Sequence, residues 1–239
     1  MNKKKNILIL AGGYGSRLYP ITKFIPKIFL KFKGSYVLDY HLKSLEQISV
    51  KNIYINILNR EIYKKFLKKY SKVKNIKFIF ENEPSGTAGI LKKILLIDSK
   101  SDLIMIYSDT LFENNQDKIL KKIIQCGKKN ISISSSLSKK NISDKGVIIT
   151  SKSNVKKFIE KPNSTQTSKL YFSGLVHIPS KHNKNLLKLL KQNLYNKKLI
   201  DFSKEILSTN KFKVKTYKTK EEPLDFGNWI DLIKNKLKK

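Results

Sequence analysis

Glycine and basic residues follow a short apolar run near the start of the chain, in the stretch ILILAGGYGSRLYPITKFIPKIFL of residues 7–30. Glycine lacks a Cβ atom, so its backbone can adopt positive φ and can lie close to a ligand. Successive exposed N–H groups in such a loop form an anion-binding concavity. The stretch therefore predicts a polyphosphate site at the end of a buried strand. Its candidate residues are Leu10, Gly12, Gly13, Gly15, Arg17 and Lys27.

Two well-known phosphate loops do not fit this stretch. Gly13 and Gly15 match the dinucleotide fingerprint G-x-G-x-x-G, but Leu18 occupies its third glycine position. The acidic residue expected about 20 positions later could only be Asp39, which lies in a helical pattern. The Gly-Lys-Ser/Thr of a P-loop is missing. On the glycines alone, a glycine-rich turn with a surface arginine stays an alternative.

Strands and helices alternate in the first half of the chain and would position this loop. We expect strands at residues 7–10, 52–57, 76–80 and 103–107, and helices at 36–48, 61–70, 88–97 and 116–126. This alternation predicts βαβ units and a mainly parallel sheet. Ligands of such sheets bind beyond the carboxyl ends of the strands. The glycine loop, residues 81–89 and Asp109 each follow a strand, so we expect them on one rim.

The second half is more mixed. We expect strands at 131–137, 146–150, 155–159, 170–178 and 212–217, helices at 183–192 and 199–207, and a final helix after Trp229. There is no internal repeat and no Pro-rich or Gly/Ser-rich linker. The chain is therefore expected to be one domain over 1–239. A nucleotide-binding part would cover about 1–130 and a sugar-binding part about 131–239.

The composition is that of an ordinary globular protein. Of the 239 residues, 40% are hydrophobic. A single cysteine, Cys126, rules out an intrachain disulfide framework and fits a reducing compartment. The first apolar run is broken by Gly12 and Gly13 too early for a signal peptide, and no apolar stretch approaches the length of a membrane helix. We expect a soluble, cytoplasmic protein that does not bind membranes.

Lysine dominates the charge, because 50 Lys and Arg stand against 18 Asp and Glu, a formal net charge of +32. Such a balance favours polyanions through counterion release, so a basic nucleic-acid-binding protein is the rival prediction. The excess is spread along the whole chain together with abundant Asn and Ile, which indicates a bias of genome composition. No zinc-finger spacing, RNP-type aromatic motif or basic leucine zipper accompanies it. We expect no specific nucleic-acid partner.

The first motif is far more specific than its glycines. G-G-x-G-x-R-L-x-P-x-T, followed by Pro26-Lys27, closely resembles the signature of the sugar-phosphate nucleotidylyltransferases, also called the NTP transferase family. The resemblance implies that the loop surrounds a nucleoside triphosphate. It implies two catalytic cations, with Arg17 gripping the leaving phosphates and Lys27 near the α-phosphate under attack.

Residues 83–89, EPSGTAG, resemble the family's second nucleotide motif. The resemblance places Gly86 and Thr87 against the base, although a turn with Thr87 as helix cap is the plainer alternative. Glu81 stands just ahead of the motif, and an ionised Glu only accepts hydrogen bonds. Guanine offers two adjacent donors on its Watson–Crick edge, so Glu81 favours GTP over UTP and dTTP.

The remaining motifs supply metal and sugar ligands by the same resemblance. Asp109 and Asp225 match the family's two metal-binding aspartates, although Ser108 replaces the usual Gly and Asn228-Trp229 depart from the usual Thr-Pro. Taken alone, either Asp is more often a cap or turn residue. Asp225-Phe226-Gly227 also spells the kinase metal motif, but no H-R-D loop accompanies it. The expected sugar 1-phosphate ligands are Gly146, Glu160, Lys161 and Ser173, where Ser173 replaces the usual Asn.

The resemblance extends from Asn6 to about Leu232 and implies both a fold and a reaction. The implied fold is α/β, a Rossmann-like three-layer fold with a mixed, mainly parallel central sheet, of the nucleotide-diphospho-sugar transferase type. The implied reaction joins a sugar 1-phosphate to an NTP with Mg²⁺ and releases pyrophosphate. The chain most resembles the short heptose or mannose 1-phosphate guanylyltransferases, without room for the repeat-built C-terminal domain of longer relatives. Uridylyl-, thymidylyl- and cytidylyltransferases, including choline-phosphate cytidylyltransferases, stay open, as does a homo-oligomer.

Overall fold

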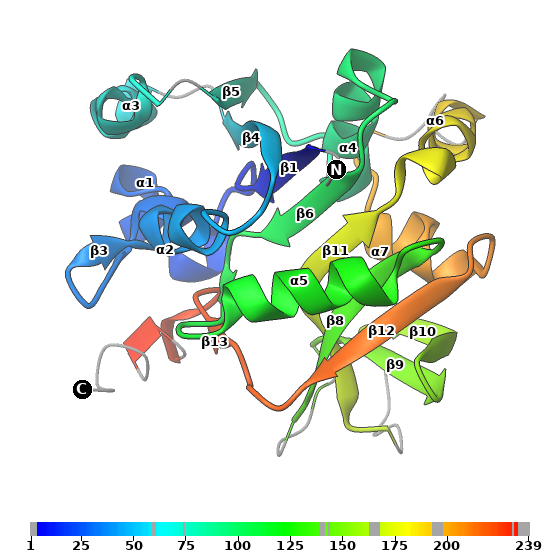
Figure 1. Cartoon of the computed structure of the whole chain (residues 1–239). Helices are drawn as coiled ribbons and strands as arrows, with labels where there is room; N and C mark the ends of the chain where they lie inside the picture. Colours follow the sequence, from blue (N-terminus) through cyan, green and yellow to red (C-terminus); the bar gives the residue numbers. More distant parts are fainter. Residues whose placement is uncertain are drawn as a thin grey trace.

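The computed structural model describes residues 4–58, 61–73, 75–138, 142, 144–162, 168–192, 198–230, 232 and 233. A nine-stranded sheet runs through these residues (Figure 1). Its strands are β1 (Lys5–Leu10), β4 (Val50–Leu58), β5 (Ile76–Glu81), β6 (Leu103–Tyr107), β8 (Ile131–Leu137), β9 (Gly146–Ser151), β10 (Asn154–Glu160), β11 (Leu170–Ile178) and β12 (Val214–Thr219). Two short ribbons pair β2 (Lys31–Phe32) with β3 (Ser35–Tyr36) and β7 (Thr110–Leu111) with β13 (Leu224–Asp225).

The strand directions give a mixed, mainly parallel sheet. The order is β5-β4-β1-β6-β11-β8-β12-β10-β9. β5, β4, β1 and β6 are mutually parallel, and β8 is parallel to β12. Only β11 and β10 of these nine described strands run against the other seven. The predicted fold class is confirmed, and the sheet continues through both halves of the chain.

Alternating side chains of the strands fill two cores, one on each face of the sheet. In β1, Ile7 and Ile9 belong to one core and Leu8 to the other, as the two-residue period of a strand requires. The first core is covered by α2 (Val37–Ser44), α3 (Lys64–Tyr70) and α5 (Gln116–Cys126). The second is covered by α4 (Thr87–Ile97), α6 (Asn183–Gln192) and α7 (Phe202–Glu205). The described elements also include the short α1 (Ile21–Phe24) and five single 3₁₀ turns. Helices on both faces make the three layers.

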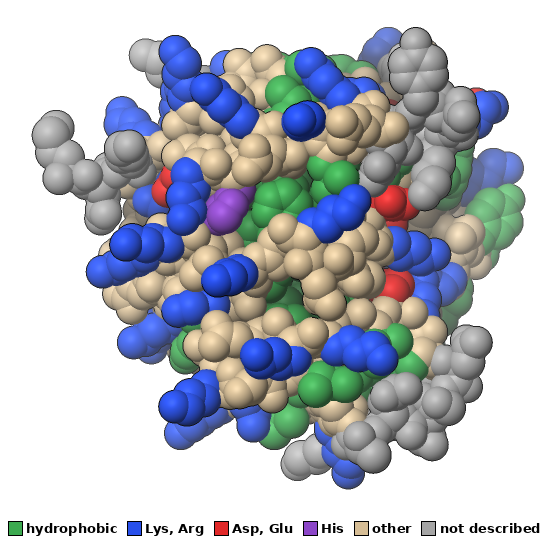
Figure 2. Space-filling view, turned by 90° about the vertical axis from the view of Figure 1, so that its right-hand side faces the viewer, with side chains coloured by type: hydrophobic (Ala, Val, Ile, Leu, Met, Phe, Trp, Pro, Cys, Tyr) green, Lys and Arg blue, Asp and Glu red, His purple; other side chains and the backbone are tan. Residues whose placement is uncertain are grey.

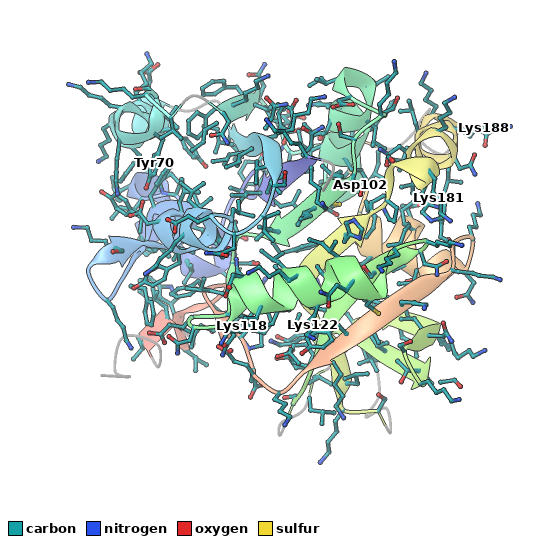
Figure 3. The ribbon with its side chains drawn as sticks, viewed as in Figure 1. Tyr70, Asp102, Lys118, Lys122, Lys181 and Lys188 are labelled. Atoms are coloured by element: carbon teal, nitrogen blue, oxygen red, sulfur yellow. The ribbon has the colours of Figure 1, made fainter. Side chains whose placement is uncertain are left out.

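The helices are amphipathic, and their polar faces carry the lysines. In α5, Ile119 and Ile123 are buried while Lys118 and Lys122 are exposed, and Figure 3 shows both lysines on the solvent side of the helix. Figure 2 shows lysines and arginines scattered over a whole face of the molecule, with uncharged surface between them. Among the described residues, no helix is both long and apolar enough to span a bilayer.

Most predicted elements agree with the structure, and one helix does not. The strands expected at 103–107, 131–137 and 170–178 and the helices expected at 116–126 and 183–192 have those bounds. The helix expected at 199–207 is wrong, because α7 begins only at Phe202 and ends at Glu205. Ile200 instead pairs its backbone with the second motif, accepting from Ala88 N–H at 2.8 Å and donating to Ser85 O at 3.1 Å. Tertiary pairing overrides the helical pattern there.

Candidate active site

The carboxyl ends of β1, β4, β5 and β6 surround a cavity of roughly 260 Å³, at the rim where parallel sheets bind ligands. Nine residues expected from the sequence line it: Leu10, Gly12, Gly13, Gly15, Lys27, Glu81, Gly86, Thr87 and Asp109. Segments about 100 residues apart in the chain therefore form one wall. The glycine loop, the second motif and the β6 terminus meet there, as the strand pattern predicted.

The glycine loop follows β1 and is held by the neighbouring strands. Asn56, near the end of β4, accepts a hydrogen bond from Ala11 N–H at 3.0 Å. A Cβ atom on Gly12 would collide with Asn56 Nδ2 and lie 2.9 Å from Glu81 Oε2, so the loop requires glycine at this position. Gly15 has φ of 67°, a left-handed conformation that favours glycine, and its carbonyl accepts from Thr22 Oγ1 at 2.9 Å.

Glu81 is buried at the back of the cavity and has three internal partners. Its Oε2 accepts from Asn56 Nδ2 at 2.8 Å. Its Oε1 accepts from Ser85 Oγ at 2.5 Å and from Lys93 Nζ at 2.9 Å. Burial works to raise the pKa of Glu81, but these three donors outweigh burial and hold that pKa below its usual value. The charged carboxylate therefore ties β4, the second motif and α4 together.

Asp109 and Lys27 form an ion pair in the cavity. Lys27 Nζ lies 3.1 Å from Asp109 Oδ2, and about a fifth of its side chain is exposed. Burial tends to raise the pKa of Asp109, but the charges of Lys27 and, to a smaller extent, Arg17 hold that pKa below its usual value. Arg17 itself is exposed. The Asp109 carboxylate is therefore anionic and has cations on the loop side.

The short ribbon of β7 and β13 brings Asp225 beside Asp109. Asp225 pairs with Thr110 in register, and Phe226 N–H donates to Asp109 O at 2.7 Å. Asp225 Oδ1 accepts from Gly227 N–H at 2.6 Å, and its Oδ2 lies 3.4 Å from Lys145 Nζ. Two aspartates that are 116 positions apart in the sequence thus occupy neighbouring backbone positions.

This donor set suits Mg²⁺ better than a metal that needs an all-protein cage. The described residues contain no group of three or more His, Cys, Asp or Glu side chains arranged to hold a metal. Mg²⁺ typically binds one or two carboxylates and takes its other ligands from water and substrate phosphates. Asp109 and Asp225 could supply that pair.

The expected sugar ligands lie outside the cavity lining, on the hairpin of β9 and β10 and on β11. Gly146 pairs with Glu160 in register, and a Cβ on Gly146 would lie 3.1 Å from Glu160 Oε2. Burial and, next, the charge of Asp201 raise the pKa of Glu160. Lys161 is exposed. Ser173 is buried, and its hydroxyl donates to Ser134 Oγ at 2.9 Å.

A closed hydrogen-bond network lies behind Asp109. His41 is fully buried on α2. Gln116 donates one amide hydrogen to His41 Nδ1 at 3.0 Å and the other to Ser44 Oγ at 2.9 Å. His41 Nδ1 must therefore accept, so Nε2 carries the proton and donates to Ser108 O at 3.3 Å. The network holds the backbone immediately before Asp109.

Sequence reasoning missed several residues of the cavity wall. Asn56 is a polar residue among the apolar residues near the end of β4, a signal that could have been used. Tyr107 is part of the β6 pattern, but its side-chain direction required the structure. Leu199 and Asp201 also line the cavity. The next residue, Phe202, is 115 positions from Thr87, and its N–H donates to Thr87 Oγ1 at 2.7 Å. No sequence signal marks that contact.

Comparison with known protein families identifies the family to which this chain belongs. The sequence profile described as "Nucleotidyl transferase" matches residues 6–239, nearly the whole chain. The chain belongs to the nucleotidyl transferase family. The cavity of this nucleotidyl transferase is built in part from the glycine loop and residues 83–89, two of the motifs on which the resemblance rested.

Two curated relatives show the range of related activities. Mannose-1-phosphate guanyltransferase 2 of Candida glabrata is 39% identical over 112 residues, which are 44% of this chain and 31% of that protein. CTP:phosphoglutamine cytidylyltransferase of Campylobacter jejuni is 32% identical over 117 residues, 45% of this chain and 44% of that protein. The matched part of this chain spans less than half the length of either relative.

A solved structure shows the same fold. HddC from Yersinia pseudotuberculosis superposes with a TM-score of 0.72 over 97% of each chain, at 24% sequence identity. The nucleotidyl transferase fold is therefore shared over both halves of the sheet.

Proposed function

We propose that this chain is a sugar-1-phosphate nucleotidylyltransferase that uses Mg²⁺ and acts as one catalytic unit over residues 1–239. The observation that carries the proposal is the Lys27–Asp109 pair in a cavity walled by a glycine loop, with Asp225 beside Asp109 just outside the cavity lining. Cations, carboxylates and exposed backbone N–H groups are what a reaction between two phosphate groups needs. No activated Ser, Cys or His is required, because such transfers depend on positioning and charge stabilisation.

The proposed reaction forms one P–O bond and breaks another. An oxygen of the sugar 1-phosphate attacks the α-phosphorus of the NTP, and pyrophosphate leaves with the electrons of the broken bond. Lys27 stabilises charge on the α-phosphate, and Arg17 stabilises the leaving pyrophosphate. Asp109 and Asp225 would hold Mg²⁺, which neutralises phosphate charge when bound. Glu160 and Lys161 would hold the hydroxyls and the phosphate of the sugar.

We propose GTP as the preferred nucleotide. The curated relative from Candida is a guanyltransferase by name. Three donors already occupy the Glu81 carboxylate, which offers about four acceptor positions. One position remains, on the Asn56 side, so Glu81 would accept from a single donor of guanine. Uracil and thymine also offer one N–H, but the carbonyls on both sides of it would face the carboxylate with acceptors. We therefore expect no more than the lower end of the about 1–3 kcal/mol that a bidentate pair discriminates by, a preference for GTP over UTP and dTTP of roughly fivefold.

The relative from Campylobacter supports CTP as the alternative nucleotide. It is a cytidylyltransferase whose named substrate, phosphoglutamine, is not a sugar phosphate. A cytidylyltransferase acting on another phosphorylated small molecule is therefore the second candidate function.

A pyrophosphate-release screen tests both candidates. Each of GTP, UTP, dTTP, CTP and ATP is paired with a panel of sugar 1-phosphates, phosphocholine and phosphoglutamine, with Mg²⁺ present. We expect turnover with GTP and one sugar 1-phosphate. No pyrophosphate should be released from any NTP when the phosphorylated second substrate is left out. Turnover with CTP and a non-sugar phosphate alone would favour the second candidate, and no turnover with any pair would refute both.

Glu81→Gln tests the base-recognition step separately. Gln would place an amide where one acceptor oxygen stood, so the ratio of kcat/KM for GTP to that for UTP should fall. Ser71→Ala, which removes a hydroxyl on the surface beyond α3, should leave the ratio unchanged and serves as the control. An unchanged ratio in Glu81→Gln would exclude Glu81 from nucleotide choice.

A further inference from the structure

Lys145, which none of the sequence motifs includes, lies beside the second candidate metal ligand. Its Nζ is 3.4 Å from Asp225 Oδ2, and about a quarter of its side chain is exposed. The same Nζ lies 4.6 Å from the ring centroid of Tyr171, a buried residue of β11. A carboxylate and an aromatic face both attract an ammonium group. The Lys145 ammonium is thus held at a defined place rather than free in solvent.

The backbone places Lys145 on the sugar-phosphate side of the site. It immediately precedes β9, and its carbonyl accepts from Lys161 N–H at 3.2 Å. The next residue, Gly146, pairs with Glu160 in the β9–β10 hairpin. Lys145 therefore lies at the same end of this hairpin as the Glu160-Lys161 pair that the proposed function assigns to the sugar phosphate.

The site contains two lysine–aspartate pairs linked by one backbone contact. Lys27 pairs with Asp109 at 3.1 Å, and both residues line the cavity. Lys145 pairs with Asp225 at 3.4 Å, outside the cavity lining. The two aspartates are joined through Phe226 N–H and Asp109 O. Two anionic phosphates must approach each other here, and each needs a cation to offset their repulsion.

We propose that Lys145 binds the phosphate group of the second substrate, the sugar 1-phosphate. This inference rests on the proposed function and names a ligand that it did not include. The Lys145 ammonium would donate a charge-assisted hydrogen bond to an oxygen of the attacking phosphate. Lys27 would serve the α-phosphate of the NTP in the same way. Each substrate phosphate would then have a lysine that pairs with an aspartate, and Lys161 would be a second cation for the sugar phosphate.

Steady-state kinetics distinguish a Lys145 that binds the sugar 1-phosphate from a Lys145 that only balances the charge of the Asp225 carboxylate. Lys145→Met keeps an unbranched side chain over Tyr171 and removes the charge, whereas Lys145→Arg keeps the charge. Lost hydrogen bonds to charged groups typically weaken binding by about tenfold or more. We expect Lys145→Met to raise the KM of the sugar 1-phosphate by about that factor, with the KM of the NTP within about twofold of normal. Lys145→Arg should restore most of the affinity.

Lys33→Met is the matched control. Lys33 also pairs with a carboxylate, Glu113 at 2.7 Å, and lies 5.5 Å from the ring centroid of Phe32. It is exposed in the turn between β2 and β3, so its loss should leave both KM values unchanged. The proposal is overturned if Lys145→Met leaves the KM of the sugar 1-phosphate unchanged, or shifts only the Mg²⁺ concentration needed for half-activity.

A binding experiment with inorganic phosphate tests Lys145 without turnover. Lys145→Met and Lys33→Met are each made on a Lys27→Met background, which removes the nucleotide-side lysine. A ligand that binds the folded state raises Tm. We expect phosphate to raise the Tm of the Lys27→Met/Lys33→Met protein clearly more than that of Lys27→Met/Lys145→Met. Equal rises would overturn the assignment of Lys145, whereas absent turnover in every substrate pair would refute the proposed function alone.

Discussion

His41 should make the folded protein sensitive to mild acid. It is fully buried, and burial lowers its pKa from 6.5 to about 4. The Ser108 carbonyl, the Asp109 charge and Gln116 act in the opposite direction but do not offset burial. In the unfolded chain the imidazole is in water, with a pKa of about 6.5. The unfolded state therefore binds more protons than the folded state between these two pKa values.

The sign and size of the effect follow from proton linkage. Stability rises with pH wherever the unfolded state binds more protons, so the free energy of unfolding should fall as the pH is lowered from 6.5 towards 4. A pKa difference of about 2.5 units corresponds to about 3 kcal/mol once both states are protonated. At pH 5 about 2 kcal/mol of this should already be lost.

Other titrating groups act in different windows or with other signs. The lowered pKa values of Asp98 and Asp102 cost stability only as the pH falls below about 4, the usual range of Asp. Glu160 has a raised pKa, so its protonation stabilises the fold as the pH falls. His182 has a lowered pKa but is only partly buried. Its effect has the same sign as that of His41 and is smaller.

Urea unfolding at pH 7.5 and pH 5, for the unmodified protein and His41→Gln, isolates the His41 contribution. Gln cannot titrate, and its amide can donate towards Ser108 as His41 Nε2 does. Between pH 7.5 and pH 5, the free energy of unfolding of His41→Gln should fall by about 2 kcal/mol less than that of the unmodified protein, whatever the stability of the variant at pH 7.5. His182→Gln, the control, should change the loss much less. Equal losses in His41→Gln and the unmodified protein would refute the buried, neutral histidine.

Three further predictions concern the reaction. Lys27→Ala should lower kcat/KM by on the order of 10²-fold, the usual loss of oxyanion-type stabilisation, with an unchanged circular dichroism spectrum; near-normal turnover would exclude this role. Asp109→Asn and Asp225→Asn should each raise the Mg²⁺ concentration needed for half-activity, and an unchanged titration for Asp225→Asn would remove it from the metal site. Gly12→Ala should raise the KM of the NTP by about tenfold or more, because its methyl group must displace Asn56 and Glu81 from the loop. Gly13→Ala should leave the KM of the NTP unchanged, because nothing lies within 4 Å of its added Cβ. Equal changes of this KM in the two variants would contradict the packing argument.

Local patterns were sufficient for most elements and for most of the cavity at the strand ends. A short apolar run that ends in glycines is typical of a buried strand followed by an open turn, so the β1 loop was predictable from Ile7 to Gly15. The same logic located residues 81–89 and Asp109, because parallel strands bring their carboxyl ends to one rim. The approach of these motifs follows from strand direction alone, without any knowledge of side-chain contacts.

Contacts between segments that are far apart in the sequence were decided only by the tertiary structure. The helix predicted at 199–207 begins only at Phe202 because Ile200 pairs its backbone with the second motif. Glu81 is held by three side chains from separate segments, so its free acceptor capacity could not be known from its position in the sequence. Lys145 reaches Asp225 only because the β9–β10 hairpin and the β7–β13 ribbon lie side by side. Sequence patterns report local backbone preference and burial, whereas these contacts depend on which distant segments pack together.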